Sequence, residues 1–133
     1  MSSLFWLGDR VALVTGASRG LGFAMAEALA AHGAHVILNG RDPATVEAAA
    51  GKLREAGYQA EPLAFDVTDA AATLAAIETI REVHGRLDVL VNNAGVQHRT
   101  ALLDWKDEDF ERLLASHLTS AFRLAREAAR LMI

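Results

Sequence analysis

The chain has 133 residues, of which 52% are hydrophobic, so it is long enough to bury the core of one compact domain. Its formal net charge of -4 leaves no basic excess, which argues against a nucleic-acid or anionic membrane partner. Cysteine is absent, which excludes disulfides and thiolate metal sites and fits a reducing compartment. The sequence shows no secretory leader pattern and no apolar run of the roughly 18 residues that a membrane span needs, so we expect a cytoplasmic protein.

Four short apolar runs, each closed by turn-forming residues, predict strands that are buried on both faces. They are residues 11–14, 36–38, 63–65 and 87–91. Strands of this kind belong to parallel sheets, so the segments between them have to cross over from one strand to the next.

Helix-length segments fill the intervals between the strands and follow the last one. They cover residues 20–32, 43–56, 69–84 and about 107–132. Proline after Asp42 is typical of a helix start, and glycines follow the first three segments. The order βαβαβαβα predicts an α/β fold with a doubly wound parallel sheet, forming one domain over residues 1–133 or part of one.

A glycine-rich turn links the first predicted strand to the first predicted helix. Gly16, Gly20 and Gly22 are spaced so that they allow a tight turn, a close approach of backbone to a diphosphate, and close packing of helix on strand. The amides and the dipole at a helix start favour a phosphate group there. The alternative is an ordinary turn without a ligand; the strand before it and the helix after it favour dinucleotide binding.

Three further motifs follow in chain order. Asp66-Val67 closes the third strand, Asn92-Asn93-Ala94-Gly95 closes the fourth, and residues 117–122 read H-L-T-S-A-F. Together with the T-G-x-x-x-G-x-G turn at residues 15–22, they make nearly the whole chain resemble the first half of the short-chain dehydrogenase/reductase family. The resemblance implies a Rossmann-type fold, a nicotinamide dinucleotide cofactor and a small-molecule carbonyl or alcohol substrate. We predict no metal-binding residues.

The resemblance and the glycine turn together give a set of candidate cofactor-binding residues. These are Gly16, Ser18, Arg19, Gly20, Leu21, Gly22, Asn39, Gly40, Arg41, Asp66, Val67, Asn93, Ala94 and Gly95. Gly40 stands where relatives that prefer NAD carry aspartate, and arginines at 19 and 41 suit a 2′-phosphate, although each could be a solvated surface charge. We therefore expect NADP(H) to be preferred, with NAD(H) possible.

The catalytic set that the resemblance implies is missing from the sequence. Family members use a tyrosine as acid or base, a lysine that lowers its pKa, and a serine that positions the substrate. The single tyrosine here is Tyr58, the lysines are Lys52 and Lys106, and no Y-x-x-x-K occurs. We expect the C-terminal catalytic part to be absent, by fragmentation or natural truncation, and this chain alone to be inactive.

His117 stands where the family usually has an asparagine that organises a proton path. Histidine donates, accepts and titrates near neutrality, so His117 is a candidate catalytic residue. The alternative is a histidine of the core or of an interface.

The substrate class is indicated by the residues after the fourth strand. The run 96–99, together with the opening 4–10, looks like gluconate 5-dehydrogenases, and Arg99 is either a partner for a sugar-acid carboxylate or a loop charge. The alternatives are a 3-oxoacyl-carrier-protein reductase and, in another class, a non-catalytic dinucleotide-binding or interaction module.

Self-association is expected from the predicted topology. A strand order of 3-2-1-4 leaves the fourth strand at an open edge, and the last helix has apolar residues on more than one face. We expect a homo-oligomer or an aggregation-prone monomer.

Overall fold

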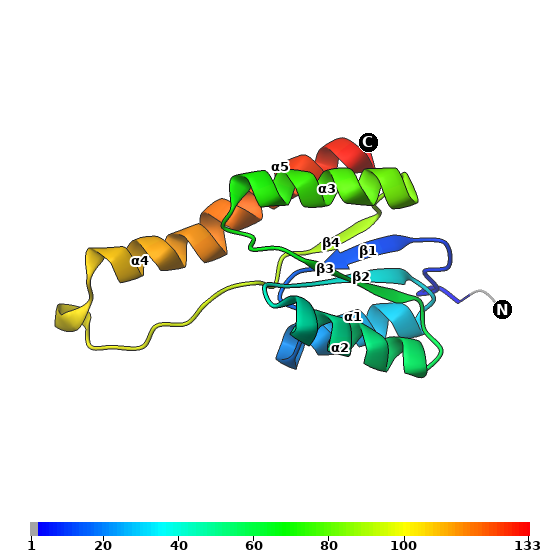
Figure 1. The fold of residues 1–133 in the computed structure, drawn as a ribbon, viewed down its shortest axis with the longest axis horizontal. Helices are drawn as coiled ribbons and strands as arrows, with labels where there is room; N and C mark the ends of the chain where they lie inside the picture. The colour runs from blue at the N-terminus through cyan, green and yellow to red at the C-terminus, as the bar shows by residue number, and fades with distance from the viewer. Residues whose placement is uncertain (1–2) are drawn as a thin grey trace.

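A parallel sheet of four strands forms the middle layer of the protein, whose computed structural model describes residues 3–133 (Figure 1). Helices α1 and α2 cover one face of the sheet, and α3 and α5 cover the other. The elements are β1 (Val11–Val14), α1 (Gly20–Ala31), β2 (His35–Gly40), α2 (Pro43–Glu55), β3 (Ala60–Ala64), α3 (Ala70–His84), β4 (Val89–Val91), a 3₁₀ turn (Leu102–Asp104), α4 (Asp107–Leu114), a π-turn (Ala115–Thr119) and α5 (Ser120–Met132).

The strand order is β3-β2-β1-β4, and all three pairings are parallel, which confirms the doubly wound arrangement expected from the sequence. The first two crossovers move outward from β1 to β2 and β3, whereas the third returns to the other side of β1. Because right-handed crossovers then place helices on opposite faces, the winding reverses between β1 and β4. Ligands of such sheets bind at this reversal, outside the carboxyl ends of the strands.

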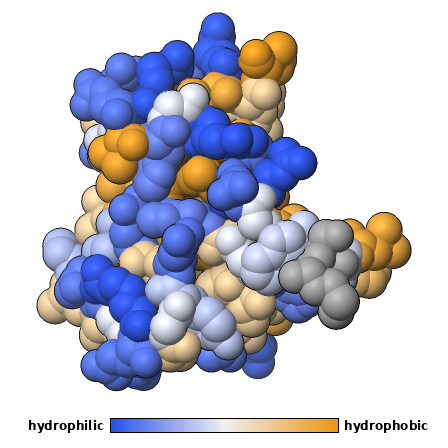
Figure 2. Space-filling view, turned by 90° about the vertical axis from the view of Figure 1, so that its right-hand side faces the viewer, coloured by the Kyte–Doolittle hydropathy of each residue, from blue (hydrophilic) through white to orange (hydrophobic). Residues whose placement is uncertain are grey.

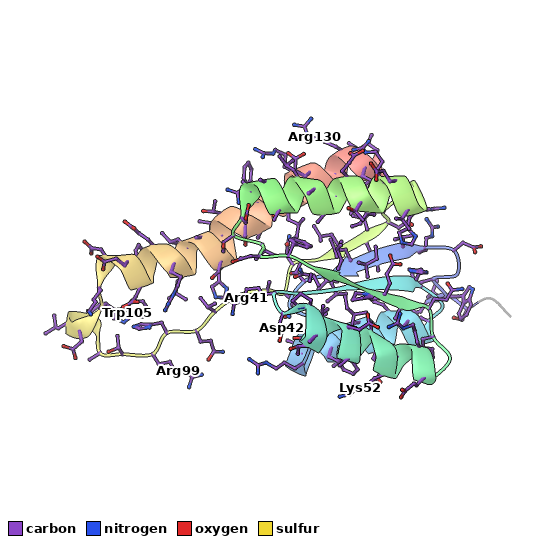
Figure 3. All side chains as sticks on the ribbon, viewed as in Figure 1. Arg41, Asp42, Lys52, Arg99, Trp105 and Arg130 are labelled. Carbon is purple, nitrogen blue, oxygen red and sulfur yellow. The ribbon has the colours of Figure 1, made fainter. Side chains whose placement is uncertain are left out.

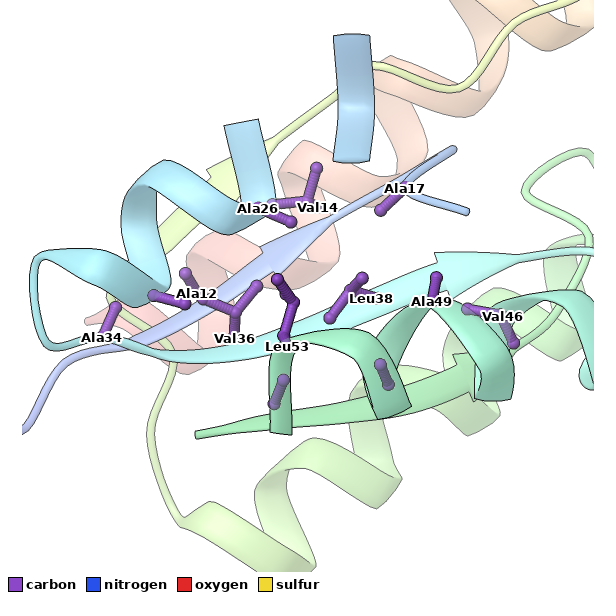
Figure 4. Close-up of a cluster of buried hydrophobic side chains, with 13 residues drawn as sticks. Ala12, Val14, Ala17, Ala26, Ala34, Val36, Leu38, Val46, Ala49 and Leu53 are labelled. Carbon is purple, nitrogen blue, oxygen red and sulfur yellow. The ribbon is translucent and has the colours of Figure 1, made fainter. Parts of the chain in front are cut away.

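Two apolar clusters hold the layers together, because successive strand residues face opposite sides of the sheet. Toward α1 and α2, β1 and β2 present Ala12, Val14, Val36 and Leu38 (Figure 4). Toward α3 and α5 they present Leu13 and Ile37, packed with residues such as Ile80 and Leu124. The small alanines of the first cluster allow α1 and α2 to lie close on the sheet.

The outer strands differ from the prediction in extent and burial. β3 begins at Ala60 and contains Pro62, which an edge strand tolerates because its missing N–H need not pair. β4 covers only residues 89–91, and Leu87 is buried without belonging to the strand. Both edge strands are only partly buried, so burial on both faces holds for β1 and β2 alone.

The last predicted helix is divided in two. A π-turn over Ala115–Thr119 separates α4 from α5, and α4 with the preceding extended segment projects away from the sheet (Figure 1). A π-turn places one more residue in a turn than an α-helix, so it changes which side chains face the sheet. No helix within residues 3–133 is both long and apolar enough to span a bilayer.

Candidate functional site

A cleft of about 500 Å³ lies at the carboxyl ends of the strands, where the winding of the sheet reverses. Its size is typical of a small-molecule pocket. The lining residues are Gly16, Ser18, Arg19, Gly20, Asn39, Gly40, Arg41, Phe65, Asp66, Val67, Thr68, Ala94, Gly95, Val96, Arg112 and Ser116.

The turn between β1 and α1 approaches the loop after β4 so closely that two positions admit only glycine. Gly16 has a φ of +60°, and a Cβ added there would lie 2.9 Å from the Cα of Ala94. A Cβ on Gly22 would clash with the carbonyl oxygen of Gly16 and lie 2.5 Å from the amide nitrogen Nδ2 of Asn93. The glycines therefore bring the start of α1 against the turn, as the spacing predicts.

Thr15 joins the two loops that form the floor of the cleft. Its hydroxyl oxygen accepts hydrogen bonds from the backbone N–H groups of Asn93 at 3.0 Å and Ala94 at 2.9 Å. The Asn93 side chain in turn donates to the carbonyl oxygen of Gly16 at 3.1 Å. Thr15 is 1% exposed, so these bonds are shielded from water and fix the loops relative to each other.

Asn39 ties the end of β2 to both neighbouring segments. Its Oδ1 accepts from the N–H of Gly16 at 3.2 Å, and its Nδ2 donates to the carbonyl oxygens of Leu63 at 3.2 Å and Phe65 at 3.0 Å. The residue is 2% exposed, so the amide replaces hydrogen bonds that water cannot supply. Its side chain therefore maintains the shape of the cleft.

Helix α1 starts at the cleft without a side-chain cap, whereas helices α2 and α3 each have one. At its N-cap position Arg19 makes no side-chain hydrogen bond to the helix, while Asp42 caps α2 and Asp69 caps α3. The first amides of α1 are therefore left for another acceptor. A diphosphate fits this place, because a helix N-terminus with free N–H groups favours an anion.

Two cations stand at the rim of the cleft next to this helix start. Arg19 and Arg41 are exposed, and no carboxylate of residues 3–133 lies within ion-pair distance of either. Together with Ser18, Asp42 and Thr45 they line a second hollow beside the cleft. Figure 3 labels Arg41 and Asp42 at the start of α2. Hydrogen bonds from the hydroxyl of Thr45 and from backbone N–H groups lower the pKa of Asp42, so this carboxylate is occupied with its helix.

Asp66 follows β3 and forms the adjoining part of the wall. The Thr68 hydroxyl and backbone N–H donate to its Oδ1 at 2.7 Å and 2.9 Å, and these bonds lower the pKa of Asp66, with a smaller contribution from the charge of Arg41. The Asp66 carboxylate therefore stays ionised at neutral pH, and its hydrogen bonds to Thr68 stabilise the turn.

The far wall comes from the end of the chain. Arg112 of α4 and Ser116 of the π-turn line the cleft, and Arg99 is not among its lining residues. Arg99 lies on the extended segment before α4 (Figure 3). His117 does not line it either. The His117 Nε2 donates to the carbonyl oxygen of Val96 at 2.6 Å, and the ring closes over Gly95.

Most of the predicted cofactor residues meet at the cleft, and a few stand behind it. Asn93 and Gly22 support the turn, and Leu21 is 71% exposed outside the lining. The prediction missed five residues that line the cleft: Phe65, Thr68, Val96, Arg112 and Ser116. Thr68 alone left a signal, since an Asp-x-Thr sequence is typical of a side-chain turn.

Comparison with known proteins gives relatives along nearly the whole chain. Gluconate 5-dehydrogenase of Gluconobacter oxydans (strain 621H) is 38% identical over 130 residues, which cover 98% of this chain and 51% of that protein. The 3-oxoacyl-acyl-carrier-protein reductase of Escherichia coli (strain K12) is 42% identical over 125 residues, covering 93% and 50%. The chain thus spans about half the length of the curated relatives it matches.

A solved structure is similar to this chain in fold as well as in sequence. The gluconate 5-dehydrogenase of Burkholderia cenocepacia J2315, in complex with NADP and tartrate, superposes with a TM-score of 0.89 at 36% identity, covering 95% of this chain and 49% of that one. The model of the short chain dehydrogenase family matches residues 10–133. Cleft, glycine turn and sequence agree with these matches, and the chain therefore belongs to the short-chain dehydrogenase family.

Proposed function

We propose that residues 1–133 are the dinucleotide-binding half of an NAD(P)-dependent oxidoreductase, and that the cleft holds NADP(H) in preference to NAD(H). The observation that carries this proposal is the uncapped start of α1 at a cleft whose rim holds two arginines, neither within ion-pair distance of a carboxylate of residues 3–133. The NADP complex of the Burkholderia relative supports the same cofactor.

The contacts of the cleft suggest a role for each part of its wall. The backbone from Gly16 to Gly22 would hold the diphosphate, and Arg19 and Arg41 the 2′-phosphate, through charge-assisted hydrogen bonds. Asp66 and Val67 would lie beside the adenine, and the loop 93–95 would complete the floor. Bound NADP(H) supplies hydride chemistry; these residues bind and orient it and exclude water.

We further propose that the substrate of the whole enzyme is a sugar acid. Arg112 brings a guanidinium to the far wall, and this cation suits a carboxylate. Tartrate, itself a hydroxy acid, accompanies NADP in the Burkholderia structure. The alternative is a 3-oxoacyl-carrier-protein reductase, which the 42% identity to the Escherichia coli enzyme favours.

Turnover by these residues alone is not expected under this proposal, because they include no Y-x-x-x-K motif. For His117 the contact with Val96 supports a positioning role for the loop after β4, while its proposed proton-path role stays a prediction. The alternative from another functional class is a module that binds the dinucleotide without catalysing a reaction.

Calorimetric titration of the purified chain is expected to show NADPH binding more tightly than NADH, without turnover of gluconate or 5-ketogluconate. Replacing either rim arginine, as in R19S or R41S, should weaken NADPH binding roughly ten- to hundredfold, because a hydrogen bond to a charged group contributes about 1.5–3 kcal/mol. NADH binding should change little, since NADH carries no 2′-phosphate.

Arg99→Ser is the matched control for this titration, because Arg99 is also exposed but does not line the cleft. It should leave both affinities as in the wild type. A folded protein that gives no heat with either dinucleotide would contradict the binding proposal. Turnover of gluconate or 5-ketogluconate by the wild-type chain would contradict the proposal that these residues alone are inactive.

We propose, finally, that the chain self-associates through the segment from α4 to α5. Phe110, Leu118 and Phe122 are 56%, 63% and 64% exposed there, and large apolar patches on a surface mark interaction sites. Light scattering is expected to give a dimer or a larger species, and the double variant L118S/F122S should shift it toward monomer. A wild-type chain that stays monomeric at all concentrations would contradict this.

A further inference from the structure

Three potential metal ligands meet at the end of the sheet opposite the cleft. His35 is the first residue of β2, Glu61 is the second of β3, and His84 is the last of α3. One ligand atom from each lies within 4.8 Å of the other two. β2 has six residues, so this end is about 17 Å from the cleft along the strand.

The backbone explains why these side chains converge. His35 lies two residues before Ile37 and so faces the same side of the sheet, toward α3. Glu61 is the register partner of Ile37 on β3 and therefore shares that face. His84 ends the helix that packs there, so three rigid elements supply one ligand each.

The hydrogen bonds within the cluster leave one donor or acceptor unsatisfied. His84 Nε2 pairs with one carboxylate oxygen of Glu61 at 2.5 Å. His35 Nε2 lies 3.6 Å from the other oxygen, is inaccessible to water and has no hydrogen-bond partner among the residues that the structure describes. A buried imidazole nitrogen without a partner is destabilising, and a cation between the three groups would satisfy it.

The donor set and its spacing suit a transition-metal ion. Two imidazoles and one carboxylate are ligands that Zn²⁺ takes in proteins, with a fourth position open to water. Its bond lengths place neighbouring ligand atoms about 3.3 Å apart, and the atoms here are between 2.5 Å and 4.8 Å apart. Small side-chain rotations are therefore enough to close the site.

The surroundings favour a cation as well. The last carbonyl groups of α3 carry partial negative charge, and Gly85 ends the helix in the left-handed conformation just beyond His84. Side-chain exposures of 29% for His35, 34% for Glu61 and 13% for His84 leave access from solvent. This end of the molecule faces the viewer in Figure 2, where hydrophilic residues predominate.

We propose that His35, Glu61 and His84 bind a divalent transition-metal ion such as Zn²⁺. The ion joins β2, β3 and α3 at the end of the sheet that the dinucleotide does not reach. The proposed site is independent of the function proposed for the cleft.

Titration of the chelator-treated full chain with zinc chloride tests the site directly. One equivalent binds with micromolar or tighter affinity, and the midpoint of thermal unfolding rises by several degrees because the ion binds the folded state. His35→Gln, Glu61→Gln and His84→Ala each weaken binding on the order of tenfold or more. Cobalt(II), used as a visible-light probe of the same ligands, loses its absorption in these variants.

His32→Gln is the control, because His32 is an exposed histidine at the end of α1 and lies outside the cluster. It binds zinc as the wild type does. Glu61→Gln keeps the size of the side chain, so it tests the site even where a histidine variant fails to fold. The proposal is overturned if zinc does not bind, or if binding persists in a folded His35→Gln/Glu61→Gln variant.

Discussion

Replacing Gly22 by alanine is expected to lower the free energy of unfolding by about 1–3 kcal/mol and to weaken NADPH binding at least tenfold. The added Cβ has no room, since it would clash with the carbonyl oxygen of Gly16 and press on the Asn93 amide. α1 would have to move away from the turn, and its first amides would move with it. Urea unfolding and calorimetric titration measure the two effects.

Gly51→Ala is the matched control for this change. Gly51 lies within α2, and a Cβ added there would have no atom within 4 Å. Alanine should stabilise the helix by about 0.5–1 kcal/mol and leave dinucleotide binding unchanged. Equal behaviour of the two variants would contradict the close approach of helix and turn.

Asn39→Asp is expected to be the most destabilising single isosteric change at the cleft, at about 3–5 kcal/mol near neutral pH. The Asn39 amide donates to the carbonyl oxygens of Leu63 and Phe65, and a carboxylate would present an oxygen to both. It would do so at a position that is 2% exposed, where water cannot compensate. Denaturant unfolding at several pH values measures the loss.

The pH dependence of this variant has a definite sign. Burial and the two facing carbonyl groups raise the pKa of the new carboxyl above its unfolded value, so the folded state binds more protons. The variant therefore loses stability, relative to wild type, as pH rises from about 4 through the folded pKa. Asn92→Asp is the control, because Asn92 is exposed with one 3.3 Å bond to Ala121, and it should cost less than about 1 kcal/mol.

The layered fold was predictable from the sequence because its signals are local. The runs of β1 and β2 are buried on both faces and therefore apolar throughout. The start of β3 was not predictable, since Glu61-Pro62 interrupts the apolar pattern. Whether a proline fits a strand depends on the position of that strand in the sheet, and local sequence does not contain this information.

The residues of the candidate site also fall into those that local sequence predicts and those that it does not. The glycine turn and Arg41 stand directly after strands, so their place at the carboxyl edge follows from chain order. Arg112 and Ser116 reach the cleft only because of how α4 and the π-turn are placed, which no periodicity of the sequence announces. The support given by Thr15 and Asn39 likewise depends on hydrogen bonds to segments that are distant in sequence.

Because the start of α1 has no side-chain cap, its backbone amides can report anion binding directly. In α2 and α3 an aspartate accepts a hydrogen bond from one amide of the first turn, Ala44 or Ala72, so the signals of these amides should respond little to dissolved anions. The amide protons of Gly20 and Leu21 have no such acceptor within the helix. Their nuclear magnetic resonance signals should therefore shift when an anion binds at the start of α1. Occupancy can thus be read, residue by residue, without any reaction taking place.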